Sequence, residues 1–148
     1  MRASCPALDL PAQYRPTASR SQGLIDGLSE IEEVAVAEDH ALAVNRNGQV
    51  FTWGLGSGGK LGLGNTANHM IPVQIIAPLF AQVAILHIAC GQRHSAAVAS
   101  DGSLFTWGVG RAGQLGHGDL KDQKAPKRVE ALAGTYTIDG LCAFPSRF

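Results

Sequence analysis

The chain has 148 residues, a length that suits one ordinary domain. Its twelve basic residues balance twelve acidic ones, so the formal net charge is zero and gives no overall attraction to phosphate backbones or anionic membranes. We therefore expect neither nucleic-acid binding nor membrane binding. The 18 glycines and the 16% share of charged residues favour many turns and little helix surface.

The three cysteines, Cys5, Cys90 and Cys142, are odd in number and widely separated. They lack the paired spacing of a zinc site or of a disulfide framework, which favours a reducing compartment. No secretory signal follows Met1, and the longest apolar run, residues 75–86, is shorter than the roughly 20 residues of a membrane-spanning helix. These features predict a cytoplasmic or nuclear protein.

Residues 1–27 carry three prolines among polar residues. Such a composition is typical of segments that bury too little apolar surface to become ordered. We predict an irregular N-terminal segment, after which regular patterns begin near residue 31.

The first regular pattern is a β-hairpin. Residues 40–44 and 49–53 are short, strand-like segments around a turn in which Gly48 can adopt a positive φ without steric cost. Gly102 offers the same turn in a second hairpin further along the chain. Because side chains alternate across a strand, two aromatic residues of each hairpin should share one side. These pairs are Phe51 with Trp53 and Phe105 with Trp107.

A glycine-rich loop, WGLGSGGKLGLGN at residues 53–65, overlaps the end of the first hairpin. It matches the G-x-G-x-x-G pattern of phosphate-binding loops, and Lys60 brings it close to a P-loop. However, Leu61 stands where a P-loop needs Ser or Thr to hold magnesium, and further glycines replace the expected helix. The pattern also recurs at residues 108–113, unlike a single-copy nucleotide fingerprint. We therefore expect no nucleotide cofactor.

Two longer segments follow the glycine-rich loops, residues 66–84 and 120–137. The two segments share a proline at the same relative position, Pro72 in the first and Pro126 in the second. We predict that both segments are connections that return the chain to the next unit.

The hairpin and the glycine-rich loop form an internal repeat. Residues 34–65 align with residues 88–119 at an offset of 54 positions without a gap, and 14 of the 32 aligned residues are identical. A fixed period of this length is the signature of a repeated supersecondary unit. The shared residues to which we assign structural roles are His40, Gly48, Trp53, Gly54, Gly56, Gly59, Leu61 and Gly62. Their counterparts are His94, Gly102, Trp107, Gly108, Gly110, Gly113, Leu115 and Gly116.

Three motifs of the chain resemble the repeat of the RCC1 family, named after the regulator of chromosome condensation. They are C-G-x-x-H-[SA]-x-A-[VL], [DN]-G-x-[VL]-[FY]-[TS]-W-G and W-G-x-G-x-x-G-x-L-G-x-G-[ND]. The resemblance covers residues 31 to about 133. The second copy fits at nearly every position, whereas the first departs at Val36 and Ala37, which replace Cys and Gly. Kelch repeats have a similar length, but their paired glycines followed by Tyr and Trp are absent.

The resemblance implies an all-β fold in which each repeat forms one four-stranded antiparallel blade of a β-propeller. The expected parts are an irregular segment at 1–27, one RCC1 repeat at 28–84, a second at 85–137 and the degenerate start of a third at 138–148. The chain would be an incomplete propeller of two blades and the beginning of a third. Because each blade buries its faces against two neighbours, we expect a fragment of a longer protein with two apolar faces open.

The shared histidines and tryptophans have a structural interpretation. His40 and His94 begin equivalent strands and are expected to form one hydrogen bond per blade, while Trp53 and Trp107 are expected to pack the blades. The other histidines share no spacing with an acid or a cysteine that would indicate zinc. No Ser, His and Asp constellation indicates a nucleophile. We expect no catalytic, cofactor-binding or metal-binding residues, and no enzyme activity.

Residues that differ between the two copies are the candidates for recognition, because exposed loops on a shared scaffold can vary their contacts. Positions 39 and 60 in the first copy and 93 and 111 in the second differ in chemistry from their counterparts. We expect all of them to be exposed. The candidates for partner binding are Asp39, Lys60, Arg93 and Arg111.

These observations favour a non-enzymatic protein-interaction scaffold that docks a protein partner on its loop-bearing face. The family resemblance adds two alternatives: a guanine-nucleotide exchange factor for a Ran-type small GTPase, or the substrate-recognition part of a HECT-type ubiquitin ligase. The inserted wedge and acidic residues that exchange requires have no match in the sequence. The catalytic domain of a ligase would lie outside the chain.

Overall fold

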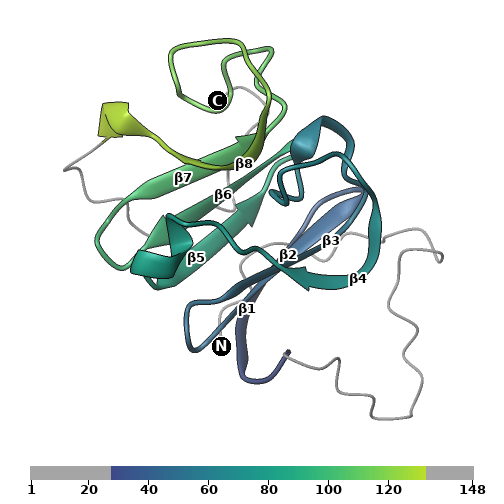
Figure 1. The fold of residues 1–148 in the computed structure, drawn as a ribbon, viewed down its shortest axis with the longest axis vertical. Helices are drawn as coiled ribbons and strands as arrows, with labels where there is room; N and C mark the ends of the chain where they lie inside the picture. The colour runs from purple at the N-terminus through teal and green to yellow at the C-terminus, as the bar shows by residue number, and fades with distance from the viewer. Residues whose placement is uncertain (1–27, 133–148) are drawn as a thin grey trace.

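The computed structural model describes residues 28–132, in which all regular structure is β-strand or short 3₁₀ turn (Figure 1). The strands form two separate four-stranded antiparallel sheets, which confirms the predicted all-β fold and its two four-stranded units. The first sheet contains β1 (Ile31–Val36), β2 (His40–Asn45), β3 (Val50–Gly54) and β4 (His69–Gln74). The second contains β5 (Ile85–Cys90), β6 (His94–Ala99), β7 (Leu104–Gly108) and β8 (Gln123–Arg128).

Each sheet is a meander in which consecutive strands pair, in the orders β1-β2-β3-β4 and β5-β6-β7-β8. The register is also the same in both sheets. His40 pairs with Gly54 in the first sheet, and His94 pairs with Gly108 in the second. The repeat in the sequence is therefore also a repeat in space, including the register of the strands.

The hairpin predicted around Gly48 is present between β2 and β3. Gly48 has a φ of 77°, and a Cβ atom at this position would lie 2.7 Å from Ala84, in the connection to the second sheet. Both the backbone conformation and the available space therefore require glycine here. Gly102 closes the second hairpin with a φ of 83°.

The segments predicted as connections contain the fourth strand of each sheet, so that prediction is wrong in part. β4 pairs with β3, and β8 pairs with β7. Both are outer strands, where a proline is tolerated because its nitrogen can face away from the hydrogen-bonded ladder. Pro72 lies within β4 and Pro126 within β8. Such a strand contains a proline, and most of its side chains are exposed or half-buried. It therefore lacks the apolar alternation by which a strand is recognised in a sequence.

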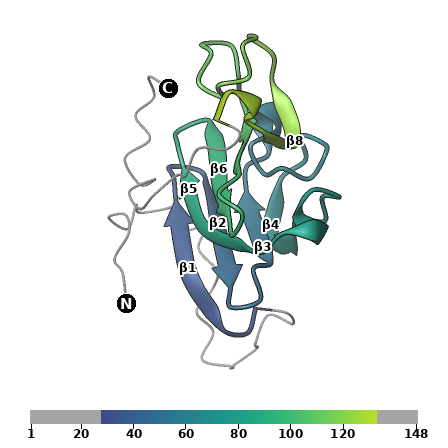
Figure 2. The ribbon, with the colours of Figure 1, turned by 90° about the vertical axis from the view of Figure 1, so that its left-hand side faces the viewer.

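The two sheets pack against each other, with β1 and β2 of the first next to β5 of the second (Figures 1 and 2). We call this contact the seam. Its apolar core includes Leu42, Val44, Ile85 and Ile88, none of which is more than 2% exposed. Burial of each such side chain contributes on the order of 2 kcal/mol of hydrophobic free energy. Each sheet therefore depends on the other for part of its core.

The connection between the sheets also enters this core. Phe80, in the 3₁₀ turn η3 (Phe80–Gln82), contacts Phe105 and Trp107 edge to face, with ring centroids 5.3 and 6.0 Å apart. Phe105 and Trp107 thus lie on the same side of β7, as the strand alternation predicts. Trp107 is fully buried, whereas Trp53, at the equivalent position of β3, is only partly buried.

Two sequence predictions lie outside the described residues: the irregular segment at 1–27 and the start of a third repeat at 138–148. Within residues 28–132, no helix is long and apolar enough to cross a membrane. Several large apolar side chains are exposed in this range, among them Ile71 of β4 and Ile76 of the following connection, at 69% and 88%.

Candidate functional site

The glycine-rich loop between β3 and β4 crosses from the first sheet to the second. It contains the 3₁₀ turn η2 (Ser57–Gly59), which packs against β7 and β8. A Cβ atom at Gly59 would come within 2.6 Å of the Lys124 backbone, and one at Gly62 within 2.7 Å of the Trp107 indole. These glycines therefore allow close contact between the sheets.

The backbone carbonyl of Lys60 is a centre of hydrogen bonding at the seam. Trp107 Nε1 donates to it at 3.0 Å, and Ser95 Oγ donates at 2.8 Å. Ser95 Oγ also lies 3.0 Å from His40 Nε2. All three side chains are buried, so each bond contributes about 1 kcal/mol without competition from water. His40 thus contacts the second sheet through a hydrogen bond, while the corresponding bond of His94, which is also buried, stays a prediction.

The side chain of Lys60 does not project into solvent. It is 3% exposed, and its Nζ lies 2.5 Å from Asp39 Oδ2. The expectation that Lys60 is exposed is wrong, because the loop folds onto the second sheet and directs the lysine back to the turn between β1 and β2. Its counterpart Gln114 is also buried.

Asp39 joins this buried network as its anion. The hydrogen bond with His40 and the nearby Lys60 ammonium lower the pKa of Asp39 to about 2, although burial opposes them. Burial lowers the pKa of His40 below its ordinary 6.5. At neutral pH the network therefore contains one carboxylate, one ammonium and an uncharged imidazole.

Asp39, His40 and Ser95 stand in the order of a catalytic triad, with 3.4 Å between Asp39 Oδ1 and His40 Nδ1. The sequence does not reveal this row, because Ser95 belongs to the other sheet. A nucleophilic serine must reach a substrate carbonyl, but this one donates its hydrogen to the carbonyl of Lys60. His40 and Ser95 are both inaccessible to solvent. The row therefore holds the two sheets together.

A hollow of about 160 Å³ opens at the seam beside Lys60. It brings together three of the four residues predicted for partner binding, Lys60, Arg93 and Arg111, while Asp39 pairs with Lys60 without lining the hollow. Arg93 lies in the turn between β5 and β6, Arg111 lies in the loop between β7 and β8, and both are exposed. We call this site the basic hollow; its other lining residues are Ser57, Gly58, Val109 and Asp122.

Cations outnumber anions at the basic hollow. Asp39 balances Lys60, and Arg111 Nη2 lies 3.4 Å from Asp122 Oδ2 in a largely exposed ion pair, which is weak. Arg93 forms no ion pair within the described part of the chain. The hollow has room for a small anionic group such as a carboxylate, to which an arginine can present two parallel N–H donors.

A side chain that the sequence analysis did not single out closes each glycine-rich loop. Asn68 Oδ1 accepts a hydrogen bond from the Gly56 N–H at 2.9 Å, and Asp122 Oδ1 accepts one from the Gly110 N–H at 3.0 Å. The two acceptors are separated by the repeat offset (122 − 68 = 54). The sequence signal that could have identified Asn68 and Asp122 is an Asn or Asp twelve residues after Gly56 and after Gly110.

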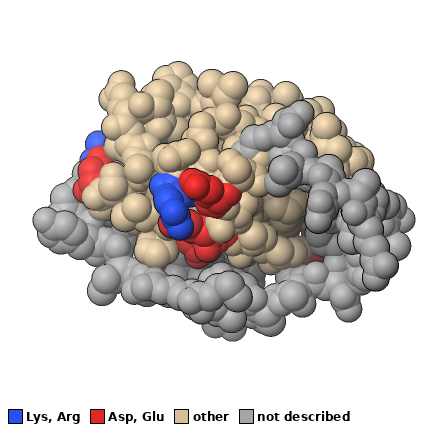
Figure 3. All heavy atoms as spheres, turned by 90° about the horizontal axis from the view of Figure 1, so that it is seen from below, with Lys and Arg blue, Asp and Glu red and all other residues tan. Residues whose placement is uncertain are grey.

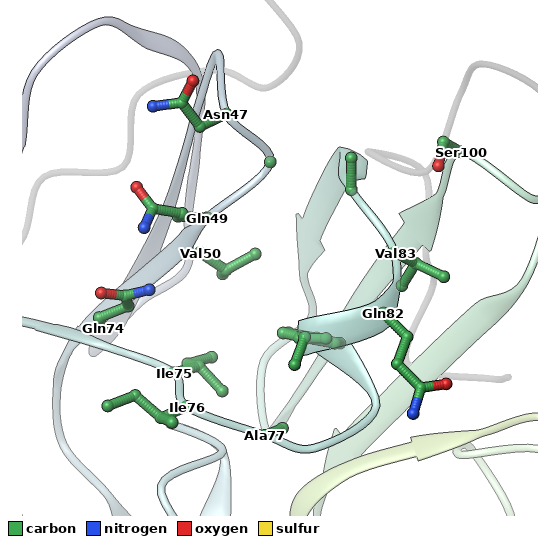
Figure 4. A pocket seen from close by; sticks show the side chains of 14 residues that line it. Asn47, Gln49, Val50, Gln74, Ile75, Ile76, Ala77, Gln82, Val83 and Ser100 are labelled. Atoms are coloured by element: carbon green, nitrogen blue, oxygen red, sulfur yellow. The ribbon is translucent and has the colours of Figure 1, made fainter.

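A larger hollow of about 520 Å³ lies at the other end of the strands (Figure 4). Asn47 and Gln49 line it from the turn between β2 and β3, and Gln74 lines it from the end of β4. Gln82 and Val83 lie across the gap on the connection (Figure 4). None of its 14 lining residues is charged. It can therefore offer hydrogen bonds but no strong acid or base.

On the face shown in Figure 3, basic and acidic side chains lie side by side. Arg46 and Glu32 form an exposed ion pair of 3.3 Å among the described residues. Among the described residues, no group of three or more His, Cys, Asp or Glu side chains could hold a metal ion. The basic hollow is thus the place where the predicted recognition residues meet.

Comparison with known proteins identifies the repeat. The sequence model of the regulator of chromosome condensation (RCC1) repeat matches residues 47–98 and 101–141, and a second model of the same repeat matches residues 85–114. The chain is 41% identical to human E3 ubiquitin-protein ligase HERC2 over 125 residues, which are 80% of the chain and 3% of that relative.

Two further relatives are similar to most of the chain. It is 44% identical to human probable E3 ubiquitin-protein ligase HERC3 over 134 residues, 90% of the chain and 12% of HERC3. It is 42% identical to the Arabidopsis thaliana ultraviolet-B receptor UVR8 over 104 residues, 70% of the chain and 23% of the receptor. The chain therefore spans less than a quarter of each of these relatives.

Solved structures show the same architecture. Human WBSCR16 superposes with a TM-score of 0.61 at 29% identity, over 66% of this chain and 25% of that one. Prp20p from Saccharomyces cerevisiae superposes with a TM-score of 0.62 at 23% identity, over 70% of this chain and 26% of Prp20p. The two sheets are thus two blades of a β-propeller, and the chain belongs to the RCC1 repeat family.

Proposed function

We propose that this chain is part of a non-enzymatic interaction scaffold and that it binds an acidic segment of a protein partner at the basic hollow. The observation that carries the proposal is the convergence of Lys60, Arg93 and Arg111, from three loops of two blades, on one small hollow. Loops on a rigid scaffold are the usual place for recognition. The triad-like row beside the hollow is buried, which supports a binding role over a catalytic one.

The three cations would act in different ways. Arg93 and Arg111 are exposed, so their guanidinium groups can turn to accommodate an aspartate or glutamate of the partner. Lys60 is buried and its charge is balanced by Asp39 at 2.5 Å, so it fixes the position of the loop at the hollow while the two arginines supply the free positive charge. Opposite charges across such a contact raise specificity and the rate of association more than affinity. We therefore expect a salt-sensitive contact.

The finer role that the similarity to HERC2 and HERC3 supports is substrate recognition within a ubiquitin ligase. Both relatives are named as ubiquitin-protein ligases, HERC3 as a probable one, and they match 80% and 90% of this chain. Ubiquitin transfer would belong to another domain. Fused to an active HECT-type catalytic domain, the wild-type chain should direct ubiquitin to proteins that it captures, and R93E/R111E should reduce that transfer.

A small GTPase is a further candidate partner, because the structure of Prp20p was described together with its binding to Gsp1p and histones. The identity with Prp20p is 23%, so this similarity concerns the fold. We expect the chain to leave nucleotide release from a GDP-loaded Ran-type GTPase unchanged. Marked acceleration of release would favour the exchange-factor alternative.

The direct test uses a labelled peptide rich in glutamate and measures fluorescence polarisation with the purified full chain. Wild type should bind the peptide, and R93E/R111E should weaken binding by at least about tenfold, because two charges at the hollow are reversed. R46E is the matched control, since Arg46 is an exposed arginine in the turn between β2 and β3. Equal losses in R93E/R111E and R46E would indicate general charge attraction and contradict the proposal.

A further inference from the structure

Asp122 places a fixed negative charge in the basic hollow. Its Oδ1 accepts the hydrogen bond from the Gly110 N–H at 3.0 Å, and its Oδ2 lies 3.4 Å from Arg111 Nη2. The side chain is 23% exposed, whereas that of Arg111 is 81% exposed. The bond to the backbone keeps the carboxylate at the hollow, so any anion that binds the arginines does so beside it.

The first blade shows that this charge is not needed to close the loop. Asn68 Oδ1 accepts from the Gly56 N–H at 2.9 Å, which is the same hydrogen bond one repeat earlier. The backbone is also equally close in both loops: a Cβ at Gly56 would clash with the Ala67 carbonyl, and one at Gly110 would clash with the Lys121 carbonyl. An uncharged amide is therefore sufficient for the loop, and the charge of Asp122 has another effect.

The charges at this place occur as a pair. The second blade has Arg111 and Asp122, whereas the first blade has the uncharged Ser57 and Asn68 at the equivalent positions. The arginine thus comes with a carboxylate that reduces its attraction for anions. We infer that Asp122 restricts which anions the hollow accepts.

The charge balance of the hollow suits a ligand with one negative charge. Asp39 balances Lys60 and Asp122 balances Arg111, which leaves Arg93 without a counter-charge among the described residues. A carboxylate would supply that one charge, whereas a phosphorylated side chain carries about −1.5 to −2. The excess charge of a phosphate would lose its hydration without gaining a cation. The carboxylate of Asp122 would also repel the phosphate about twice as strongly.

We propose that Asp122 makes the basic hollow selective for carboxylates over phosphorylated side chains. The inference rests on the proposed function, because it concerns the acidic segment that binds at this hollow. Arginine clusters commonly bind phosphorylated motifs, and a repulsive group is an effective way to reject a wrong ligand. A partner bound through an aspartate or glutamate would then gain no affinity from a phosphate at the same position.

Fluorescence polarisation with the full chain and two peptides tests this selectivity. One is the glutamate-rich peptide, and the other has a phosphoserine in place of its central glutamate. Both are amidated at the C-terminus, so only side chains supply negative charge. Wild type should bind the phosphoserine peptide no more tightly than the glutamate peptide. D122N, which keeps an acceptor for the Gly110 N–H, should bind the glutamate peptide about threefold more tightly and the phosphoserine peptide about tenfold more tightly.

D101N is the matched control. Asp101 Oδ1 accepts a hydrogen bond from the Ser103 N–H at 2.9 Å, so asparagine can keep this bond as well. The turn of Asp101 precedes β7 and the loop of Arg111 follows it, so the two lie at opposite ends of that strand. D101N changes the net charge as D122N does and should leave the preference between the peptides unchanged. Equal shifts in the two variants would overturn the proposal, as would a wild type that prefers the phosphoserine peptide by about threefold or more.

Titration with small anions separates this inference from the proposed function. The amide signal of Gly110, which bonds to Asp122, reports on the hollow in a nitrogen-15 spectrum of the full chain. At about pH 8, where phosphate is mainly a dianion, D122N should raise the affinity for inorganic phosphate about threefold more than that for acetate. Equal gains for the two anions would contradict the selectivity, even if the glutamate peptide binds at the hollow. If R93E/R111E left peptide binding intact, the proposed function would fail, while the Gly110 signal would still measure the selectivity of the hollow.

Discussion

The ammonium of Lys60 is buried, whereas the Asp39 carboxylate that faces it at 2.5 Å is partly exposed, with exposed fractions of 3% and 29%. The two halves of this pair should therefore differ in their effect on stability. D39N leaves a buried cation without its counter-charge and should lower the free energy of unfolding by about 2 kcal/mol. K60M fills a similar volume and leaves a carboxylate that water can reach, so it should cost about 1 kcal/mol.

Urea unfolding of D39N and K60M measures this difference. Both substitutions remove the same ion pair, so each serves as the control for the other. Equal losses, or a larger loss in K60M, would mean that burial of the lysine does not determine the energy of the pair.

Alanine substitutions at Gly62 and Gly64 distinguish the cost of a steric clash from the cost of backbone strain. Both have a positive φ, of 75° and 82°. A Cβ at Gly64 would meet nothing within 4 Å, whereas one at Gly62 would lie 2.7 Å from Trp107 Nε1. G64A should therefore cost only the strain of about 1–2 kcal/mol. G62A should cost about 2 kcal/mol more, because the loop must move away from the indole.

Thermal unfolding can rank the two alanine variants against wild type. If G62A and G64A shifted the unfolding midpoint equally, the close approach of the loop to Trp107 would not contribute to the free energy of unfolding.

The strands that the sequence could predict are those fixed by local chemistry. The turn at Gly48 needs a positive φ, and the segments beside it alternate in a way that marks a hairpin. Repetition at an offset of 54 then transfers the same hairpin to residues 94–108. β4 and β8 were missed because an outer strand tolerates Pro72 or Pro126 and buries few side chains, so its pattern is that of a loop.

The site was predictable only in part, because most of it depends on contacts between blades. Differences between the copies identified Arg93 and Arg111, which do lie at one hollow. The burial of Lys60 follows from a loop that folds onto the next blade, and no local pattern carries that information. Ser95 and His40 meet for the same reason. Contacts between equivalent positions, such as Glu33 with His87, could have been predicted from the repeat itself.

Thr52 and Thr106 occupy equivalent positions but differ in their hydrogen bonds. Thr106 Oγ1 donates to the Leu115 carbonyl at 2.6 Å, whereas Thr52 Oγ1 is buried without a partner. T106V should therefore lower the free energy of unfolding by about 1–2 kcal/mol, since it leaves a carbonyl unsatisfied. T52V removes an unpaired hydroxyl without changing the shape and should be neutral or stabilising. Urea unfolding of the two valine variants tests this, and a larger loss in T52V would contradict it.

Acidification should destabilise the protein in two phases. Burial lowers the pKa of His40 and of His94 below 6.5, so the unfolded chain takes up protons first and the free energy of unfolding falls as the pH drops through 6.5. The second phase belongs mainly to Asp39, whose pKa is lowered from 3.8 to about 2. Its contribution, about 1 kcal/mol after allowance for solvent screening, is complete above pH 3.8 and is lost as the pH falls to about 2.

Urea unfolding at a series of pH values measures both phases, and two variants assign them. H40Q should reduce the slope below pH 6.5, because glutamine takes up no proton in either state. D39N should reduce the change between pH 3.8 and about 2 while leaving the histidine phase in place; part of the change remains because hydrogen bonds from Ser103 also lower the pKa of Asp101. A free energy of unfolding that rises as the pH falls below 6.5 would mean that the buried histidines are charged in the folded protein. An uncharged His40 that bonds to Ser95, which in turn bonds to the Lys60 carbonyl, would then be the wrong description of the seam.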